Sequence, residues 1–423
     1  MIQAIFMPEK GNSLKKVYFW TVLAGMTYAG SSFLMSMVVS SFMGAAAAGV
    51  LAIAVSIGNQ LVTVGYYNMR PFQVSDVREK YSFSQYAGFR LQTILLMLAV
   101  ALVWVLAGGY RGEKMLAILF MAVFKVGESL SDLLEGRYQQ KERYDVSCRG
   151  VFVKTVLYLL AFFLTLFLTK NLMGAIAAMA IVYLLSIWII DRVLMPNFGG
   201  FSLEFSWKIS RALMMECLPV FLNSFFMTYI ANASKYAMDR YYENEYLGIF
   251  NALYMTAFVV NLFSGFILKP MITPLSLKYD QGDLHGFSKA VCRQGLIIAA
   301  LTVLCIGGAW LLGLPVLGLL FGLDLTGYKT ALCIIVAGGA FTAVYQLLQY
   351  VVVIMRHQNG CLLACISTAI LTFIFTPVLV RKYGILGGAV GYFFSMAFMS
   401  ALILIIWLYY MRKERRAKAW QNE

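Results

Sequence analysis

The feature that most limits what this chain can fold into is a series of long apolar runs. A helix needs about 20 apolar residues to cross a hydrocarbon core of roughly 30 Å. Twelve runs reach that length, at residues 17–41, 46–68, 88–109, 114–135, 151–169, 172–193, 212–235, 246–268, 291–312, 330–353, 361–379 and 384–410. Because lipid offers no partners to backbone polar groups, each run must be helical. The sequence therefore predicts an all-α polytopic membrane protein with twelve transmembrane helices.

Composition and charge agree with a membrane protein and argue against a nucleic-acid partner. The chain has 423 residues, of which 61% are hydrophobic and 13% charged, and its mean hydropathy is +0.76. Soluble domains carry about a quarter charged residues. The net charge of +14 is explained by basic residues that gather on cytoplasmic loops and contact anionic lipid. Membrane lipids are therefore expected partners, and nucleic acid is not.

The distribution of Lys and Arg predicts that both termini are cytoplasmic. With that orientation the cytoplasmic segments carry far more cations than the external ones, as the positive-inside rule requires. The segment Arg412–Lys418 then forms a basic cytoplasmic tail.

The chain is predicted to consist of two six-helix bundles, residues 1–200 and 201–423. The segment between them contains Pro196, Gly199 and Gly200. Both bundles begin with two long helices joined by a tight turn, and the glycines of these turns, Gly49 and Gly248, are 199 residues apart. Repeats in the same topological sense predict pseudo-two-fold symmetry about an axis along the membrane normal.

Several classes of enzyme lack their sequence signatures here. The chain has no phosphate-binding G-x-x-x-x-G-K-[ST] and no H-E-x-x-H metal motif. It contains only two histidines, and its seven cysteines are scattered. The connecting segments are too short for the catalytic loop of a membrane polymerase or ligase. We therefore predict neither enzymatic activity, nor a cofactor, nor a metal site.

Run 114–135 carries charges where lipid would not tolerate them alone. Lys125 is the one cation that the sequence places near mid-membrane, and Glu128 and Asp132 follow it at helical spacing. A lone charge there costs about 3 kcal/mol. Lys125 is therefore either part of a charged cavity wall or one half of an internal ion pair that only fixes helix packing.

Run 212–235 carries a polar stripe that continues beyond its end. Ser224, Thr228, Asn232, Lys235 and Asp239 are spaced by 4, 4, 3 and 4 residues and share one helix face. Such a stripe must face protein or water. Glu216 lies near the predicted cytoplasmic end of this helix, and Arg240 near the external end. For Lys235 and Arg240 the alternative is snorkelling to the interface.

Polar residues also recur at helical spacing on other runs of the two bundles. Asn59, Tyr254 and Gln346 are examples. A single such residue commonly serves as interhelical glue. Their concentration on a few helices instead predicts a wet space between the bundles.

At this point the sequence resembles a known family. The run Phe205–Ser224, with Pro219 and with Cys217 where the family usually has Gly, resembles the start of the second half of polysaccharide-biosynthesis flippases of the multidrug/oligosaccharidyl-lipid/polysaccharide (MOP) superfamily. The segments Asn232–Tyr241 and Tyr246–Tyr254 resemble the family's "Asp-Arg … Gly-x-Tyr" turn. Leu134–Tyr144 and Tyr383–Gly391 are similar to further family segments.

The resemblance implies a flippase that carries an undecaprenyl-pyrophosphate-linked oligosaccharide across the bacterial plasma membrane by alternating access. Its partners would be the lipid-linked glycan and the polymerase or glycosyltransferases of the same pathway. The cavity would be lined by Lys125, Asn59, Ser224, Thr228, Asn232, Lys235, Arg240, Tyr254 and Gln346. Glu128, Asp132 or Glu216 would couple ion movement. The alternative is a cation-coupled multidrug or small-molecule exporter of the same fold.

Overall fold

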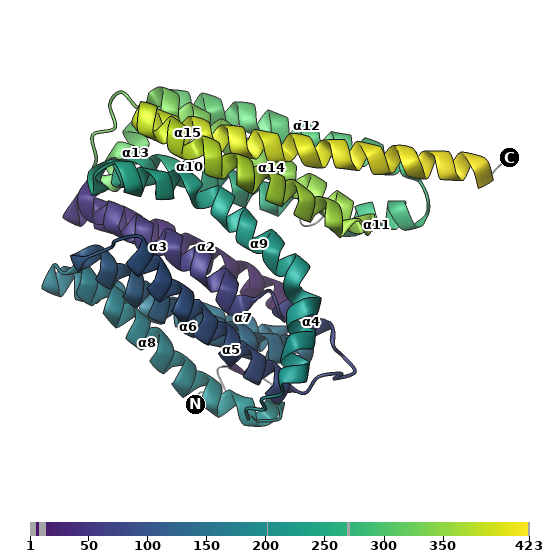
Figure 1. Ribbon diagram of the computed structural model, residues 1–423, viewed down its shortest axis with the longest axis horizontal. Coiled ribbons are helices and arrows are strands. Elements are labelled where there is room, and N and C mark those ends of the chain that lie inside the picture. Colours follow the sequence, from purple (N-terminus) through teal and green to yellow (C-terminus); the bar gives the residue numbers. More distant parts are fainter. Residues whose placement is uncertain (1–5, 8–13, 201, 269–270, 422–423) are drawn as a thin grey trace. The chain divides into compact units, whose positions relative to one another are not determined.

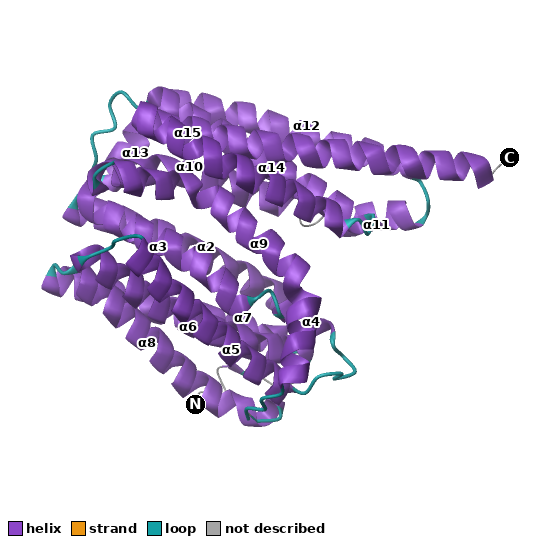
Figure 2. Cartoon of the chain, in the orientation of Figure 1, coloured by secondary structure: helices purple, strands orange, loops and turns teal. Residues whose placement is uncertain are grey.

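The computed structural model describes residues 6–7, 14–200, 202–268 and 271–421. Its described residues form helices and connecting loops (Figure 2). Phe201, where the predicted second bundle begins, lies outside the described residues.

Among the described residues, twelve helical segments have the length of membrane spans, which agrees with the predicted number. In the first half these are α2 (Leu14–Met43), α3 (Ala45–Tyr66), α5 (Phe83–Ala107), α6 (Gly112–Gln140), α7 (Tyr144–Thr169) and α8 (Leu172–Leu194). In the second half they are α9 (Trp207–Tyr241), α10 (Asn244–Leu268), α12 (Leu284–Gly308), α14 (Lys329–Ile354) and the two parts of α15 (Gln358–Gln421). Shorter elements connect them: α4 (Arg70–Ser75), η1 (Met195–Phe198), α11 (Ile272–Asp280), the π-helical turn η3 (Ala309–Gly313) and α13 (Leu314–Phe321) (Figure 1).

Length and hydropathy alone identify fewer spans. Among the described residues, nine helices meet a strict apolar criterion for spanning a membrane. The charged helix α6 and the helix α10 are not among them, and α15 counts as one although Gly384 (φ 56°, ψ −129°) interrupts it. The chain is therefore a multi-pass, all-helical membrane protein, and one of its spans, α6, carries charged side chains.

Packing divides the chain into two compact units. Unit 1 comprises Met1–Val39 and Val50–Phe225, and unit 2 comprises Ser40–Gly49 and Phe226–Glu423. This packing boundary lies inside α9, whereas the predicted repeat boundary at 200/201 lies in the loop before it. The assignment of two six-helix bundles to 1–200 and 201–423 stays a prediction.

Unit 2 contains a reciprocal contact between the first turns of α3 and α10. A Cβ atom added to Gly49 would overlap the carbonyl oxygen of Asn244, and one added to Gly248 would overlap the carbonyl oxygen of Ala45. Small residues four positions apart let two helix backbones approach this closely. The two turn glycines that the sequence singled out therefore both lie where α3 and α10 approach closely.

Replacing either turn glycine by alanine should destabilise the protein. Because backbone, not a flexible side chain, occupies the space, Gly49→Ala and Gly248→Ala should each cost about 1–3 kcal/mol through overpacking. Gly307→Ala, on α12 with no atom within 4 Å of the added carbon, is the matched control and should be neutral or slightly stabilising. Thermal unfolding of the purified protein in detergent measures the difference, and equal midpoints for all three variants would contradict the contact.

Candidate functional site

The mid-membrane lysine of α6 has an internal partner. The Nζ atom of Lys125 lies 2.7 Å from Oε2 of Glu128, one turn later on the helix. The hydroxyl of Tyr28 on α2 donates to Oε1 of the same carboxylate at 3.1 Å. Lys125 and Glu128 are both buried. The structure thus places them in the ion pair that the sequence left open as the alternative to a charged cavity wall.

A second cluster surrounds Asp132, one turn further along α6. Arg90 of α5 donates from Nη2 to Oδ2 of Asp132 at 2.7 Å, and only 1% of Arg90 is exposed. Arg70 of α4 reaches Oδ1 of Asp132 at 3.3 Å and Oε2 of Glu135 at 3.2 Å. Two guanidinium groups thus share the carboxylate of Asp132, and charge-assisted hydrogen bonds of this kind are among the stronger ones in proteins.

A third cluster is centred on Lys154 of α7. Its Nζ lies 3.6 Å from Oε1 of Glu135 and 3.3 Å from Oδ2 of Asp191 on α8, and it donates to Ser131. Tyr138 donates its hydroxyl proton to Oδ1 of Asp191 at 2.7 Å. Lys154 therefore connects α6, α7 and α8 through charged hydrogen bonds.

Together these groups form the ionic network of unit 1, which is balanced in charge. Its cations are Arg70, Arg90, Lys125 and Lys154, and its carboxylates are Glu128, Asp132, Glu135 and Asp191. Sequence reasoning counted Arg70, Arg90 and Lys154 only as loop charges that set the orientation. Their positions could have indicated burial, because Arg90 and Lys154 fall inside predicted apolar runs.

A polar hollow of about 460 Å³ opens beside this network in unit 1. Its lining includes Tyr66, Asn68, Arg70, Asp132 and Gln139. The Asn68 amide donates to Oγ of Ser224 at 2.7 Å, which ties the first part of α9 to the hollow. One aromatic ring surrounded by planar polar side chains offers both stacking and hydrogen bonds to a hydroxyl-rich ligand.

The rest of the α9 stripe lies in unit 2 and includes a buried lysine. The Asn232 amide donates to the carbonyl oxygen of Thr228 at 3.0 Å. Lys235 is 6% exposed, and its Nζ lies 4.5 Å from the centre of the Tyr254 ring. In the described part of the chain no carboxylate lies within ion-pairing distance of Lys235. Lys235 is therefore buried in the protein and does not snorkel, and among the described side chains its charge lies against the face of the Tyr254 ring.

Other predicted site residues are exposed or locally bonded. Arg240 is exposed beside the ring of Tyr241. Glu216 is exposed and bonds to Lys80 at 2.9 Å and to the hydroxyl of Tyr81 at 3.1 Å.

The remaining residues of the predicted cavity belong to both units. Tyr254 donates its hydroxyl proton to the carbonyl oxygen of Ala231 at 2.9 Å. Asn59 on α3 in unit 1 and Gln346 on α14 in unit 2 are half-buried. A shared cavity that brings these residues together stays a prediction.

An ionic contact outside the membrane spans provides a test by pH. Glu79 accepts from Lys141 at 2.7 Å and from Arg137 at 2.8 Å, and the Lys141 bond, followed by the Arg137 bond, holds the pKa of Glu79 below its ordinary value of 4.5. The stabilisation is present above that value and is lost as the pH falls through the lowered folded-state pKa. Near neutral pH, Glu79→Gln should therefore lower the free energy of unfolding by less than about 1 kcal/mol, which appears as a slightly lower unfolding temperature. In acid the difference from the wild type should vanish. A difference that persists in acid would contradict this assignment.

Removing the central lysine of the network should be far more damaging. Lys154→Ala leaves Asp191 and Glu135 buried without their ammonium partner, which costs about 3–5 kcal/mol. The matched control is Lys141→Ala, whose side chain is 44% exposed and whose loss costs less than about 1 kcal/mol. Chemical unfolding in mixed micelles gives both values. Equal stability of the two variants would show that the network does not hold α6, α7 and α8 together.

Comparison with known proteins adds a distant relative and a set of similar folds. No protein-family model matches the chain. A capsular polysaccharide biosynthesis protein, CapF of Staphylococcus aureus, is 22% identical over 342 residues, which cover 79% of this chain and 83% of CapF. The lipid II flippase MurJ in an inward closed conformation has a TM-score of 0.71 at 13% identity, covering 92% of this chain and 87% of MurJ. An inward-facing multidrug resistance MATE family transporter of the MOP superfamily has a TM-score of 0.62 at 14% identity and covers 98% of both chains.

The structural matches extend over nearly all of the described helices, and the sequence match is with a protein named for capsular polysaccharide biosynthesis. The protein therefore has the fold of the MOP superfamily transporters and is a distant homologue of a capsular polysaccharide biosynthesis protein.

Proposed function

We propose that this protein is a flippase that moves a lipid-linked oligosaccharide, carried on undecaprenyl pyrophosphate, across the bacterial plasma membrane by alternating access. The name of its relative CapF supports a role in surface polysaccharide biosynthesis. The proposal includes cytoplasmic termini and a functional link to the glycosyltransferases and polymerase of the same pathway. The charge distribution of the two units supports the substrate class.

The observation that carries the proposal is the unmatched charge of Lys235. This ammonium group is buried beside Tyr254, and no carboxylate of the described chain pairs with it. A buried cation is costly unless it gains a partner. A pyrophosphate or an acidic sugar would supply that partner, so the site favours an anionic substrate.

The ion pairs of the carboxylates weigh against the alternative function, an exporter of organic cations. Such an exporter needs a carboxylate that is available to its substrate. Each carboxylate of the ionic network, Glu128 and Asp132 included, already faces an internal cation at 3.6 Å or less. Glu216 is exposed and bonded to Lys80. The polar hollow beside Arg70 is suited to uncharged sugar hydroxyls, because its guanidinium and carboxylate groups neutralise one another.

Replacing Lys235 should impair export of the glycan. Lys235→Ala removes a charged contact of about 1.5–3 kcal/mol, so we expect a loss of surface polysaccharide of about tenfold or more and accumulation of lipid-linked precursor on the cytoplasmic leaflet. Lys235→Arg keeps the charge and should retain part of the activity. The assay is complementation of a deletion strain, with protein levels checked on immunoblots.

Lys289→Ala is the control, since Lys289 is an exposed lysine of the same unit and its loss should leave export intact. Normal export by stably folded Lys235→Ala would refute the anionic site. Resistance to cationic dyes upon overexpression, without an effect on surface glycan, would favour the exporter instead.

A further inference from the structure

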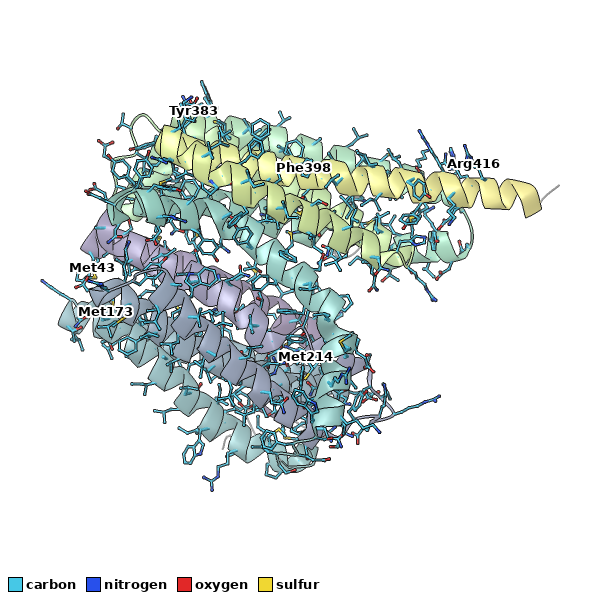
Figure 3. The ribbon with its side chains drawn as sticks, viewed as in Figure 1. Met43, Met173, Met214, Tyr383, Phe398 and Arg416 are labelled. Carbon is cyan, nitrogen blue, oxygen red and sulfur yellow. The ribbon has the colours of Figure 1, made fainter. Side chains whose placement is uncertain are left out.

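Four tyrosines line one hollow at an end of unit 2. They are Tyr242, Tyr246, Tyr328 and Tyr383, and the hollow has a volume of about 520 Å³. Figure 3 shows Tyr383 at the kink of α15, at the opposite end of its C-terminal part from Arg416. None of these residues belongs to the charged groups discussed above. The volume lies within the roughly 300–1,000 Å³ of small-molecule sites.

Three separate segments build this tyrosine hollow. Tyr242 and Tyr246 flank the turn between α9 and α10, with ring centres 5.5 Å apart. Tyr328 precedes α14, and Tyr383 precedes the kink of α15 at Gly384. The Tyr242 hydroxyl donates to the carbonyl oxygen of Arg381 at 3.4 Å. Because Gly384 has a φ of 56°, which other residues rarely adopt, the kink that shapes one wall is built into the sequence.

The polar groups that line the tyrosine hollow are available to a ligand. Among the described residues, no protein group hydrogen-bonds the hydroxyls of Tyr246, Tyr328 or Tyr383. Lys382 is the one charged residue among those that line the hollow in the described part of the chain. It is exposed, and its Nζ lies 5.1 Å from the centre of the Tyr383 ring. The site thus offers aromatic faces, free hydroxyls and one cation.

An interfacial aromatic belt is the simpler explanation for tyrosines at helix ends. In such a belt the rings lie around the perimeter at headgroup depth. Here rings from three segments converge on one concavity, and Tyr242 is fixed against the backbone of another segment. A belt does not require this convergence.

We propose that the tyrosine hollow is a binding site for an acidic saccharide, in which sugar rings stack on the tyrosines and a carboxylate or phosphate pairs with Lys382. Tyrosine rings supply large amphipathic contact area at low entropic cost. The hydroxyls of Tyr246, Tyr328 and Tyr383 can bond to sugar hydroxyls, and a lysine pairs with an anionic substituent. None of the residues that line this hollow is among those of the transport path proposed above, so the proposal stands without that path.

The test is binding of trigalacturonate to the purified full-length protein in phosphatidylcholine nanodiscs, measured by saturation-transfer NMR and calorimetry. Maltotriose, which is uncharged, should bind at least fivefold more weakly. Tyr383→Ala should weaken trigalacturonate at least fivefold. Lys382→Gln should reduce trigalacturonate to the affinity of maltotriose and abolish the dependence of binding on salt.

The control is Tyr409→Ala, which removes an exposed tyrosine at the far end of α15 and should leave binding unchanged. Lys382→Gln changes an exposed side chain and keeps the test valid if Tyr383→Ala fails to fold. Absence of binding, or equal binding by wild type and Lys382→Gln, would overturn the proposal. If trigalacturonate binding is lost in phosphatidylglycerol nanodiscs, the hollow binds a lipid headgroup, and this outcome would also overturn the proposal. Export by Lys235 variants tests the flippase separately.

Discussion

The structure of unit 1 depends on the need to neutralise every charge that its helices carry into the membrane. A single uncompensated charge at mid-depth costs about 3 kcal/mol, and α6 alone carries four charged groups of the network. Their partners on other helices come from α4, α5 and α7, and Lys154 of α7 also pairs with Asp191 of α8. The helices must therefore adopt relative positions that close these pairs. Ionic matching adds directional constraints that apolar packing in lipid lacks.

The two units use charge differently. The ionic network of unit 1 pairs four cations with four carboxylates, and the polar hollow beside it is lined by one charge of each sign, Arg70 and Asp132. In the described part of unit 2 the one buried charge is Lys235, next to Tyr254. The internal ion pairs of unit 1 stabilise one fixed arrangement of its helices. A buried charge without a carboxylate partner is instead stabilised most when an anion binds. This contrast is the reason for proposing an anionic substrate in preference to an organic cation.

The helices were predictable from the sequence because the requirement for about 20 apolar residues acts locally. The Lys125–Glu128 pair was also within reach, since it spans one helical turn. The partners of Asp132 were not, because Arg90 is 42 residues away and comes from another helix. Tyr242, Tyr328 and Tyr383 gave no sequence signal for the same reason. The burial of Lys235 needed the structure, since snorkelling and burial have the same sequence pattern.

The reciprocal glycine contact has a consequence for the history of the chain. Gly49 leaves room for the backbone at Asn244, and Gly248 leaves room for the backbone at Ala45. If the two halves arose by duplication, their sequences were free to diverge at most positions, but not at this crossing. A side chain gained in one turn can be accommodated only if the other turn retreats. After such a duplication, sterics alone would keep a glycine in both turns, independently of the cargo.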